Sequence, residues 1–326
     1  MPNNIITSTA LDQPIVRYLA HQRALGRGYE GEERVLDSVR QFVAQESAAD
    51  LDAARFDRWC DSQRELSTNT LRARQLTVRK FCLYRQRTEP NCFVPNSLYF
   101  TRPQPYTPPI IVEPEQVARM LAATTHLAPT PGSPLLPAVM RIALVLLYTA
   151  GLRRGELVRL TLADVEPRSG VLRIADSKFH KSRWVPLSPS ACTELRRYLR
   201  ARLAAPLDAR PSAPLLCNRS RGCRSYTGGG LSQGIHKLFD AAGVHDSEGR
   251  QPRIHDLRHS YAIEALIRWY RVGADLQAQL PKLAMYMGHV SIVSTAHYLR
   301  LVPAVAALAS ARFEKAFGEI LQEHRP

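Results

Sequence analysis

Residues 255–259 read His-Asp-Leu-Arg-His, and Gly288-His289 and Tyr298 follow them further along the chain. A tyrosine is a weak nucleophile until its surroundings stabilise the phenolate and the charge that develops on its target. The chain supplies suitable side chains from distant segments: Arg153, Lys178, His255, Arg258 and His289. The motifs contain no cluster of carboxylates. This combination predicts a site that attacks phosphodiesters with no metal and no other cofactor.

Arginine and lysine suit different atoms of a phosphodiester. Attack places extra negative charge on the non-bridging oxygens, and a guanidinium donates two parallel hydrogen bonds to such oxygens. Arg153 and Arg258 are therefore the predicted clamp. Glu156 lies three residues after Arg153, so on a helix it would share a face with that arginine and orient it. Lys178 lies between two predicted strands, where its ammonium could protonate the departing 5′-oxygen.

The order of these motifs resembles that of the tyrosine recombinases, the phage-integrase family. The motifs are Gly-Leu-Arg-Arg-Gly-Glu-Leu at 151–157, a hairpin lysine at Lys178, His-Asp-Leu-Arg-His at 255–259, Gly288-His289, and Tyr298. The resemblance is strong from about Pro109 to the C-terminus and weaker over the first hundred residues. It implies a site-specific recombinase of the integrase, transposase or resolvase type. Such an enzyme cuts and rejoins DNA through a covalent 3′-phosphotyrosine, here on Tyr298.

The two histidines take different places in this resemblance. His255 stands three residues before Arg258, so the two would be neighbours on a helix. It could hydrogen-bond the phosphate or accept the tyrosine proton. His289 follows Gly288, a predicted helix end, and resembles the family's phosphate-binding position.

Two assignments have a competitor nearby. Aligning the chain on Val185-Pro186-Leu187 places Lys178 on the family's catalytic lysine. The same alignment places Lys181 on a nearby basic position, where it is a predicted DNA contact. Tyr286 precedes the Gly-His pair and so falls outside the pattern that selects Tyr298.

The composition is that of a basic globular protein. At 326 residues the chain is long enough for two domains, each with its own core. The net charge of +15 and the pI of about 9.9 favour a polyanionic partner, and double-stranded DNA fits that description. Residues 1–102 carry 15 Lys/Arg against 12 Asp/Glu, and the remainder carries 29 against 17. Most of the positive charge therefore lies in the part that holds the motifs.

Cysteine usage and hydropathy favour a reduced, intracellular protein. The six cysteines form no Cys-x-x-Cys pair, and the spacing of Cys217, Cys223 and His236 fits no standard zinc pattern. The first residues lack the basic start and apolar run of a signal peptide. No run approaches the roughly 18 apolar residues of a membrane span. We therefore expect no metal and no membrane contact, and a bacterial cytoplasmic protein associated with the nucleoid.

The first hundred residues predict a helical bundle. Apolar residues recur at three- and four-residue spacing at 15–25 and 32–45, and 53–64 and 67–87 are further predicted helices. The last helix contains six Lys/Arg and no acid, which favours a helix lying on DNA phosphates. Its predicted DNA contacts are Arg72, Arg74, Arg79 and Lys80. In the family, a small core-binding bundle closes over DNA, and residues 1–102 are expected to form such a domain.

The proline-rich stretch 90–109 predicts a semi-rigid linker without helix. Beyond it we expect helices at 113–123, 137–149, 189–203, 231–242 and 256–270, strands at 171–174 and 184–187, and loops at 206–214 and 228–230. The predicted fold is therefore mainly α with a small antiparallel β-sheet. It comprises the helical core-binding bundle and a catalytic domain at 103–326. The stretch between His259 and Gly288 is longer than the resemblance leads us to expect.

The C-terminal stretch 304–320 has apolar residues on one helical face, and packing within the same chain would explain them. In the family a terminal helix docks on a neighbouring protomer and links the tyrosines of a tetramer on two DNA sites. The resemblance therefore implies an interprotomer helix at 304–320 and a homo-tetramer, which could also include related recombinases.

Two other classes of DNA-binding protein are alternatives to a recombinase. A type IB topoisomerase relaxes DNA with a similar residue set, but the N-terminal bundle and the C-terminal tail disfavour it. A non-catalytic DNA-binding protein is disfavoured by the intact set of six catalytic residues. The motifs do not specify the target DNA sequence. They also do not distinguish integration from excision, resolution or inversion, or identify a mobile element.

Overall fold

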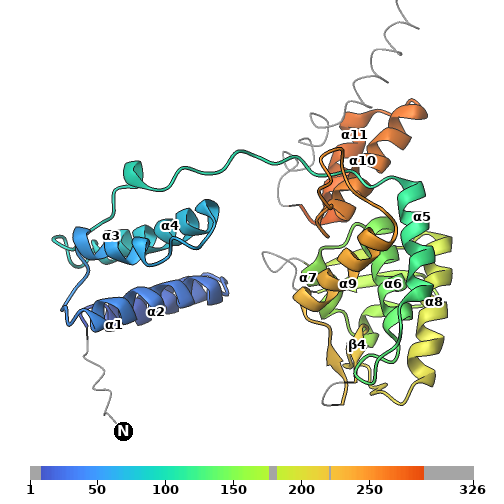
Figure 1. Ribbon diagram of the computed structural model, residues 1–326, viewed down its shortest axis with the longest axis horizontal. Helices are drawn as coiled ribbons and strands as arrows, with labels where there is room; N and C mark the ends of the chain where they lie inside the picture. The colour runs from blue at the N-terminus through green and yellow to red at the C-terminus, as the bar shows by residue number, and fades with distance from the viewer. Residues whose placement is uncertain (1–8, 176–181, 220–221, 290–326) are drawn as a thin grey trace, which may run out of the picture. The chain divides into compact units, whose positions relative to one another are not determined.

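The computed structural model describes residues 9–175, 182–219 and 222–289 and is drawn in Figure 1. The chain divides into two compact units, Met1–Thr107 and Pro108–Pro326. Each unit has its own cluster of buried apolar side chains. Among the described residues, no helix is both long enough and apolar enough to cross a membrane.

The described part of the first unit is a bundle of four α-helices, each of which lies where the sequence predicts one. They are α1 (Asp12–Ala24), α2 (Glu30–Gln45), α3 (Ala53–Asp61) and α4 (Thr68–Arg85). Asp52 caps α3 and Ser67 caps α4, because each side chain accepts a main-chain N–H from the first turn. Apolar side chains of all four helices form one buried cluster, in which Trp59 is almost completely buried.

A short 3-10 helix, η1 (Ser97–Tyr99), interrupts the proline-rich stretch. The expectation that this stretch holds no helix is therefore wrong at this point. The side-chain oxygen of Asn96 accepts the N–H of Leu98 at 3.0 Å. Such a local bond can support a single turn where the surrounding prolines prevent a longer helix.

The second unit is mainly helical, as predicted. Its α-helices are α5 (Pro114–Ala123), α6 (Leu136–Thr149), α7 (Arg154–Arg159), α8 (Pro189–Ala204), α9 (Gly228–Ala241), α10 (Asp256–Arg271) and α11 (Leu276–Met287), with short 3-10 helices η2 (Thr124–His126) and η3 (Leu162–Asp164). Apolar residues cover almost the whole surface of α6, which is typical of a central buried helix. It contacts α7, α8, α9 and α10, and Figure 1 shows it running through the middle of the unit.

The described residues of this unit also form two small antiparallel sheets. The first consists of β1 (Val165–Glu166), β2 (Val171–Ile174) and β3 (Arg183–Pro186), and the second of β4 (Cys217–Asn218) and β5 (Arg224–Ser225). In the first sheet Ile174 pairs with Arg183 and Leu172 with Val185. Strands of two residues, such as β1, β4 and β5, are too short to show the period of two that identifies a strand in sequence. The structure confirms a mainly α fold with small antiparallel sheets.

The glycine run 228–230 forms the first turn of α9, so its prediction as a loop is wrong. The hydroxyl of Thr227 caps the helix by accepting the N–H of the third glycine at 3.0 Å. Each glycine costs about 1 kcal/mol relative to alanine. Leu231, Ile235 and Leu238 are each 0% exposed further along the helix, and burial of each contributes roughly 1.5–3 kcal/mol. The buried face therefore outweighs the glycines.

Helix α11 lies beyond residue 270, where the sequence predicted a helix end at Gly288 but no bounds for the helix. Pro281 lies inside this helix and obscures its pattern, because proline removes a main-chain hydrogen bond and usually ends a helix. Asp275 caps the helix by accepting the N–H of Gln277 at 2.8 Å. Its buried residues belong to the same apolar cluster as those of α10, and this packing stabilises α11.

Candidate active site

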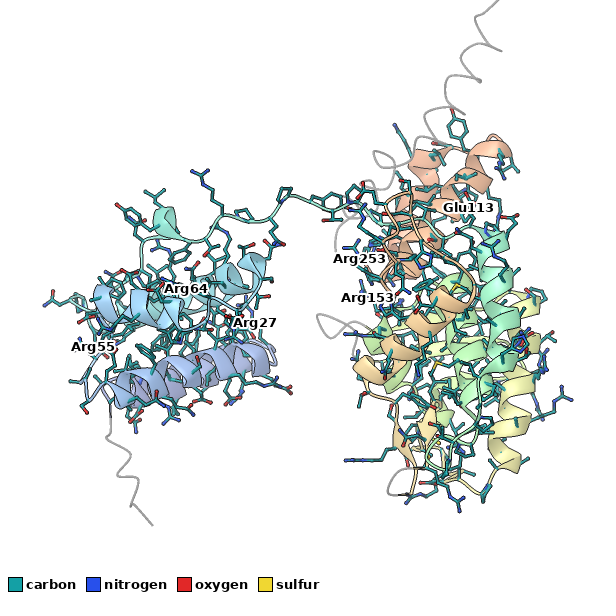
Figure 2. All side chains as sticks on the ribbon, viewed as in Figure 1. Arg27, Arg55, Arg64, Glu113, Arg153 and Arg253 are labelled. Carbon is teal, nitrogen blue, oxygen red and sulfur yellow. The ribbon has the colours of Figure 1, made fainter. Side chains whose placement is uncertain are left out.

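The turn after α6 requires glycine at position 151. Gly151 has a φ of +59°, and a Cβ there would lie 2.5 Å from Cδ1 of Tyr261. The turn leads the chain into α7 and leaves Arg153 at the N-cap of that helix. Figure 2 shows Arg153 on the same edge of this unit as Arg253.

Glu156 forms the buried centre of the site, with a side chain only 1% exposed. Its carboxylate accepts the main-chain N–H of Arg153 at 2.9 Å and Nη1 of Arg153 at 2.7 Å. Arg183, at the start of β3, donates Nη1 and Nη2 to the same carboxylate at 3.0 and 2.9 Å. Burial alone would raise the pKa of Glu156, but the hydrogen bonds and charge of Arg183, with the bonds from Arg153, outweigh it and lower the pKa to about 2. Glu156 is therefore ionised at neutral pH and orients the two arginines.

Three consecutive carbonyl oxygens at the end of α11 each accept a hydrogen bond from a different arginine. Tyr286 O accepts Nε of Arg183 at 2.7 Å, Met287 O accepts Nη2 of Arg258, and Gly288 O accepts Nη2 of Arg153 at 2.8 Å. The last carbonyls of a helix lack partners within the helix and carry partial negative charge, so cations stabilise them. Arginines from three distant segments are thereby held at the residues just before His289.

Glycine is also required at position 288. Gly288 ends α11 in the left-handed conformation, with a φ of +66°. A Cβ at this position would lie 2.8 Å from Nη1 of Arg183. The next residue, His289, donates its main-chain N–H to Ala284 O at 2.8 Å, which closes the end of the helix.

Arg258 and His255 come from the start of α10. Arg258 is 1% exposed and donates Nη1 to Gly151 O and Nη2 to Met287 O, so it joins the turn after α6 to the end of α11. His255 is the N-cap residue and is exposed. Its ring meets that of His259 edge-on, with the ring centroids 4.7 Å apart.

The histidines of the site have lowered pKa values. Although part of the His255 residue reaches solvent, loss of hydration lowers its pKa to about 4, and the charges of Arg258 and Arg153 add to this effect. Loss of hydration is also the main reason why the pKa values of His259 and His289 fall to about 4. The charges of Arg258 and Arg153 act on His289 as well. The structure therefore brings five predicted site residues into one electrostatic environment: Arg153, Glu156, His255, Arg258 and His289.

The remaining predicted residues of the catalytic unit, Lys178, Lys181 and Tyr298, lie outside the described residues, as does the predicted helix 304–320. Their roles stay predictions. Lys178 and Lys181 belong to the segment between β2 and β3. The strand residues nearest to this segment are Ile174 and Arg183, which pair with each other.

The predicted DNA contacts of the first unit all lie on α4, in different environments. Arg72 and Arg79 donate hydrogen bonds to main-chain oxygens within 95–101. Arg74 donates to a glutamine side chain, and Lys80 is exposed. Two of the four side chains therefore hold the segment that follows the helix. DNA contacts from all four stay predictions.

Arg183 is a residue of this cluster that the sequence patterns did not single out. Residues 183 and 185 share a face of β3, and Val185 is completely buried. A charged residue on the buried face of a strand requires an opposite charge or hydrogen-bond partners. This was the signal in the sequence that could have identified Arg183.

Known proteins resemble this chain in sequence and in fold. Residues 111–304 match the phage integrase family. The putative integrase/recombinase y4rB of Sinorhizobium fredii is 31% identical over 312 residues, which cover 93% of this chain and 96% of that protein. The putative integrase/recombinase y4rE of the same organism is 37% identical over 213 residues, or 65% of this chain and 66% of its own length. The structure of the Tn1549 transposon integrase in complex with a circular intermediate DNA has a TM-score of 0.62 and 18% identity, over 94% of this chain and 100% of that chain.

Proposed function

This chain belongs to the phage integrase family, and from this we infer that it is a site-specific tyrosine recombinase, an enzyme that cuts and rejoins double-stranded DNA. The observation that carries this is the convergence of Arg153, Arg258, His255 and His289 around the end of α11. The two arginines match the charge of a phosphodiester. The buried carboxylates beside them already have partners, because Glu156 pairs with Arg153 and Arg183, and Asp256 pairs with Arg253.

The arginines and His289 bind the scissile phosphate in this proposal. Arg153 is 24% exposed, and its bonds to Glu156 and Gly288 leave further N–H groups of its planar fork for a non-bridging oxygen. Donors that are already oriented before the reaction stabilise the charge that develops on these oxygens. Arg258 also secures the turn and the helix end that position the other groups.

In the proposed cleavage step the phenolic oxygen of Tyr298 attacks the phosphorus. A phosphorus–oxygen bond to the tyrosine forms, and the bond from phosphorus to the 5′-oxygen breaks. The phenolic proton passes to His255, and Lys178 gives a proton to the departing 5′-oxygen. The products are a 3′-phosphotyrosine and a 5′-hydroxyl. Attack by the 5′-hydroxyl of a partner strand reverses the step and rejoins the DNA.

Trapping a covalent adduct on DNA that flanks the gene tests this function directly, with footprinting to locate the site. We expect an adduct that survives denaturant and forms at one footprinted sequence. Failure to form any adduct would favour a non-catalytic DNA-binding protein. Relaxation of a supercoiled plasmid that lacks the footprinted site would favour a type IB topoisomerase.

The pH dependence of cleavage is expected to reflect the lowered pKa of His255. At about pH 5 a histidine with a pKa near 6.5 is mostly protonated, whereas His255, with a pKa of about 4, stays mostly neutral and can accept a proton. We therefore expect the rate of adduct formation at limiting DNA to be maintained down to about pH 5 and to fall below it. A falling limb centred near pH 6.5 would contradict this role.

The same lowered pKa values predict that the folded protein becomes less stable as the pH falls. The folded-state pKa values of His255, His259 and His289 lie below the unfolded value of 6.5. Protonation therefore favours the unfolded chain, so stabilisation is fully present above about pH 6.5 and is lost as the pH falls toward 4. Melting temperatures must be measured at each pH alongside the rates, so that unfolding is not mistaken for protonation of the base.

Sulfur in place of the 5′-bridging oxygen is expected to rescue Lys178→Ala. A thiolate leaves without a proton, because thiols have pKa values near 8.5 and alcohols are far less acidic. The variant should cleave ordinary DNA poorly and the sulfur-substituted DNA almost as fast as the wild type. Arg153→Ala should show no comparable rescue, since its target is a non-bridging oxygen. If sulfur rescues Lys181→Ala instead, the general acid is Lys181.

We also propose a homo-tetramer on two DNA sites, linked by the C-terminal segment 304–320, and a bacterial cytoplasmic location where DNA is accessible. The transposon integrase of similar fold supports a role in mobile-element transfer.

Truncation after Pro303 should preserve binding to one site and abolish paired-site complexes in gel-shift experiments. A truncated protein that still pairs two sites would show that the segment is not the link.

A further inference from the structure

We propose that Arg183 is a positioning residue for DNA cleavage, which holds Glu156 and the end of α11 so that Arg153 meets the scissile phosphate. This inference rests on the proposed recombinase function. Arg183 is not one of the six residues to which the sequence motifs assign a catalytic role.

The hydrogen bonds that Arg183 makes within the protein leave few of its N–H groups for a substrate. Its side chain is 10% exposed. Nη1 and Nη2 donate to the two oxygens of Glu156, and Nε donates to Tyr286 O at 2.7 Å. All three nitrogens of the guanidinium are thus directed at the protein. These contacts direct the effect of Arg183 to Glu156 and α11.

These contacts close a ring of interactions. Arg183 binds Glu156, Glu156 binds Arg153, and Arg153 binds Gly288 O. The main chain of α11 returns from Gly288 to Tyr286, whose carbonyl binds Arg183. Each member is thus held from two sides. Without Arg183 the ring opens, and the direction of the Arg153 guanidinium depends on Glu156 and Gly288 alone.

Gly288 provides independent support for this arrangement. A Cβ at this position would lie 2.8 Å from Nη1 of Arg183, so the guanidinium fills the space that the missing side chain leaves. Gly288 directly precedes His289, whose pKa responds to Arg153 and Arg258. The position of Arg183 is therefore linked to both phosphate-binding groups, Arg153 and His289.

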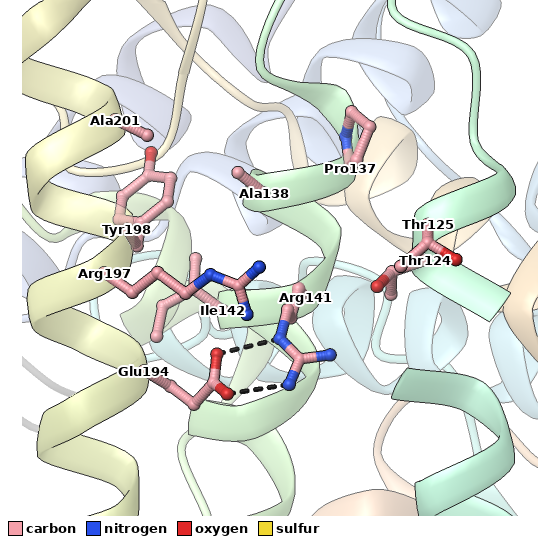
Figure 3. A pocket seen from close by; sticks show the side chains of 10 residues that line it. All are labelled: Thr124, Thr125, Pro137, Ala138, Arg141, Ile142, Glu194, Arg197, Tyr198 and Ala201. Carbon is pink, nitrogen blue, oxygen red and sulfur yellow. Dashed lines mark hydrogen bonds and ion pairs between the residues drawn. The ribbon is translucent and has the colours of Figure 1, made fainter. Parts of the chain in front are cut away.

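Arg141 offers a matched control within the same unit. It donates Nε and Nη2 to the two oxygens of Glu194 at 2.8 and 2.7 Å, and Nη1 to Leu121 O at 3.2 Å. Figure 3 shows this pair in a pocket between α6 and α8. Arg141 and Arg183 therefore make the same kinds of contact, one carboxylate and one main-chain carbonyl. None of the residues that line the Arg141 pocket belongs to the predicted catalytic set.

The test compares two DNA substrates, one with an ordinary scissile phosphate and one with a methyl group in place of a non-bridging oxygen. The methyl group removes the negative charge that Arg153 would stabilise. Arg183→Lys keeps a positive charge beside Glu156 but loses the planar fork. We expect it to form adduct on ordinary DNA roughly tenfold to a hundredfold more slowly than the wild type, the range expected for a displaced catalytic group. On the methyl-substituted DNA its rate should approach that of the wild type.

The ratio of the two rates distinguishes positioning from folding, because a smaller folded fraction lowers both rates equally. Arg141→Lys should keep the wild-type ratio. Arg183→Gln, which has a neutral side chain, should change the ratio in the same direction as Arg183→Lys. An unchanged ratio in both Arg183 variants, whether their rates are normal or reduced, would overturn the inference. Absence of adduct from the wild-type protein would instead overturn the proposed function, and the inference with it.

Discussion

Tyr298→Phe should bind its DNA site nearly as tightly as the wild type and form no covalent adduct. The substitution removes only the phenolic oxygen, which is the atom that would bond to phosphorus. Basic side chains elsewhere supply the attraction to DNA phosphates, and they are unchanged. Gel-shift titration measures the binding, and denaturing electrophoresis of labelled DNA measures the adduct.

Tyr286→Phe is the matched control for this experiment. Tyr286 lies next to the site, but its hydroxyl donates to Pro186 O at 3.0 Å, and burial raises its pKa. Both effects disfavour the phenolate that a nucleophile requires. We therefore expect Tyr286→Phe to form the adduct. Adduct in the Tyr298 variant, with none in the Tyr286 variant, would move the nucleophile to Tyr286.

Arg153→Ala and Arg258→Ala should each reduce cleavage on the order of a hundredfold or more, as expected when an oriented donor to developing charge is lost. Their stabilities should differ. In Arg153→Ala the buried Glu156 keeps its two bonds to Arg183. Gly288, whose carbonyl loses a partner, is only half-buried, so water can replace the donor. This variant should therefore melt close to the wild-type temperature.

Arg258→Ala should also be less stable. Arg258 is 1% exposed, and its loss leaves the carbonyls of Gly151 and Met287 without its two hydrogen bonds, at a cost of roughly 1–3 kcal/mol for each buried group left unsatisfied. Single-turnover adduct formation and thermal unfolding separate the two effects. Wild-type cleavage by either variant would exclude that arginine from the clamp. Wild-type stability of Arg258→Ala would show that its buried bonds contribute little.

Local patterns in the sequence were sufficient for the fold class and most helices. Apolar spacing predicts α1 and α2, because a helix that packs on one core must repeat its apolar residues every three or four positions. The motif at 151–157 predicts that Arg153 and Glu156 are neighbours, since their spacing of three is a property of the helix itself. The order of the motifs also predicts the catalytic family, which the match of residues 111–304 confirms.

Local sequence patterns failed to predict two helical segments, because tertiary packing stabilises a helix there against the local preference. The glycines at 228–230 predict a loop, but the cap at Thr227 and the buried face of α9 make them helical. Pro281 obscures α11, yet the apolar cluster shared with α10 holds this helix in place. In both cases the free energy of apolar burial exceeds an unfavourable local preference.

Only the tertiary structure decided how the site is held together. Arg153 and Gly288 are 135 residues apart, and Arg183 and Tyr286 are 103 apart, so no spacing rule could connect them. Their contacts exist because α6, α10 and α11 pack so that the end of α11 faces the turn after α6. The chemistry of the site follows from which residues the chain contains. Its geometry follows from the carbonyls at the end of α11 and the buried carboxylate of Glu156, which need hydrogen-bond donors, and arginines brought from distant segments supply them.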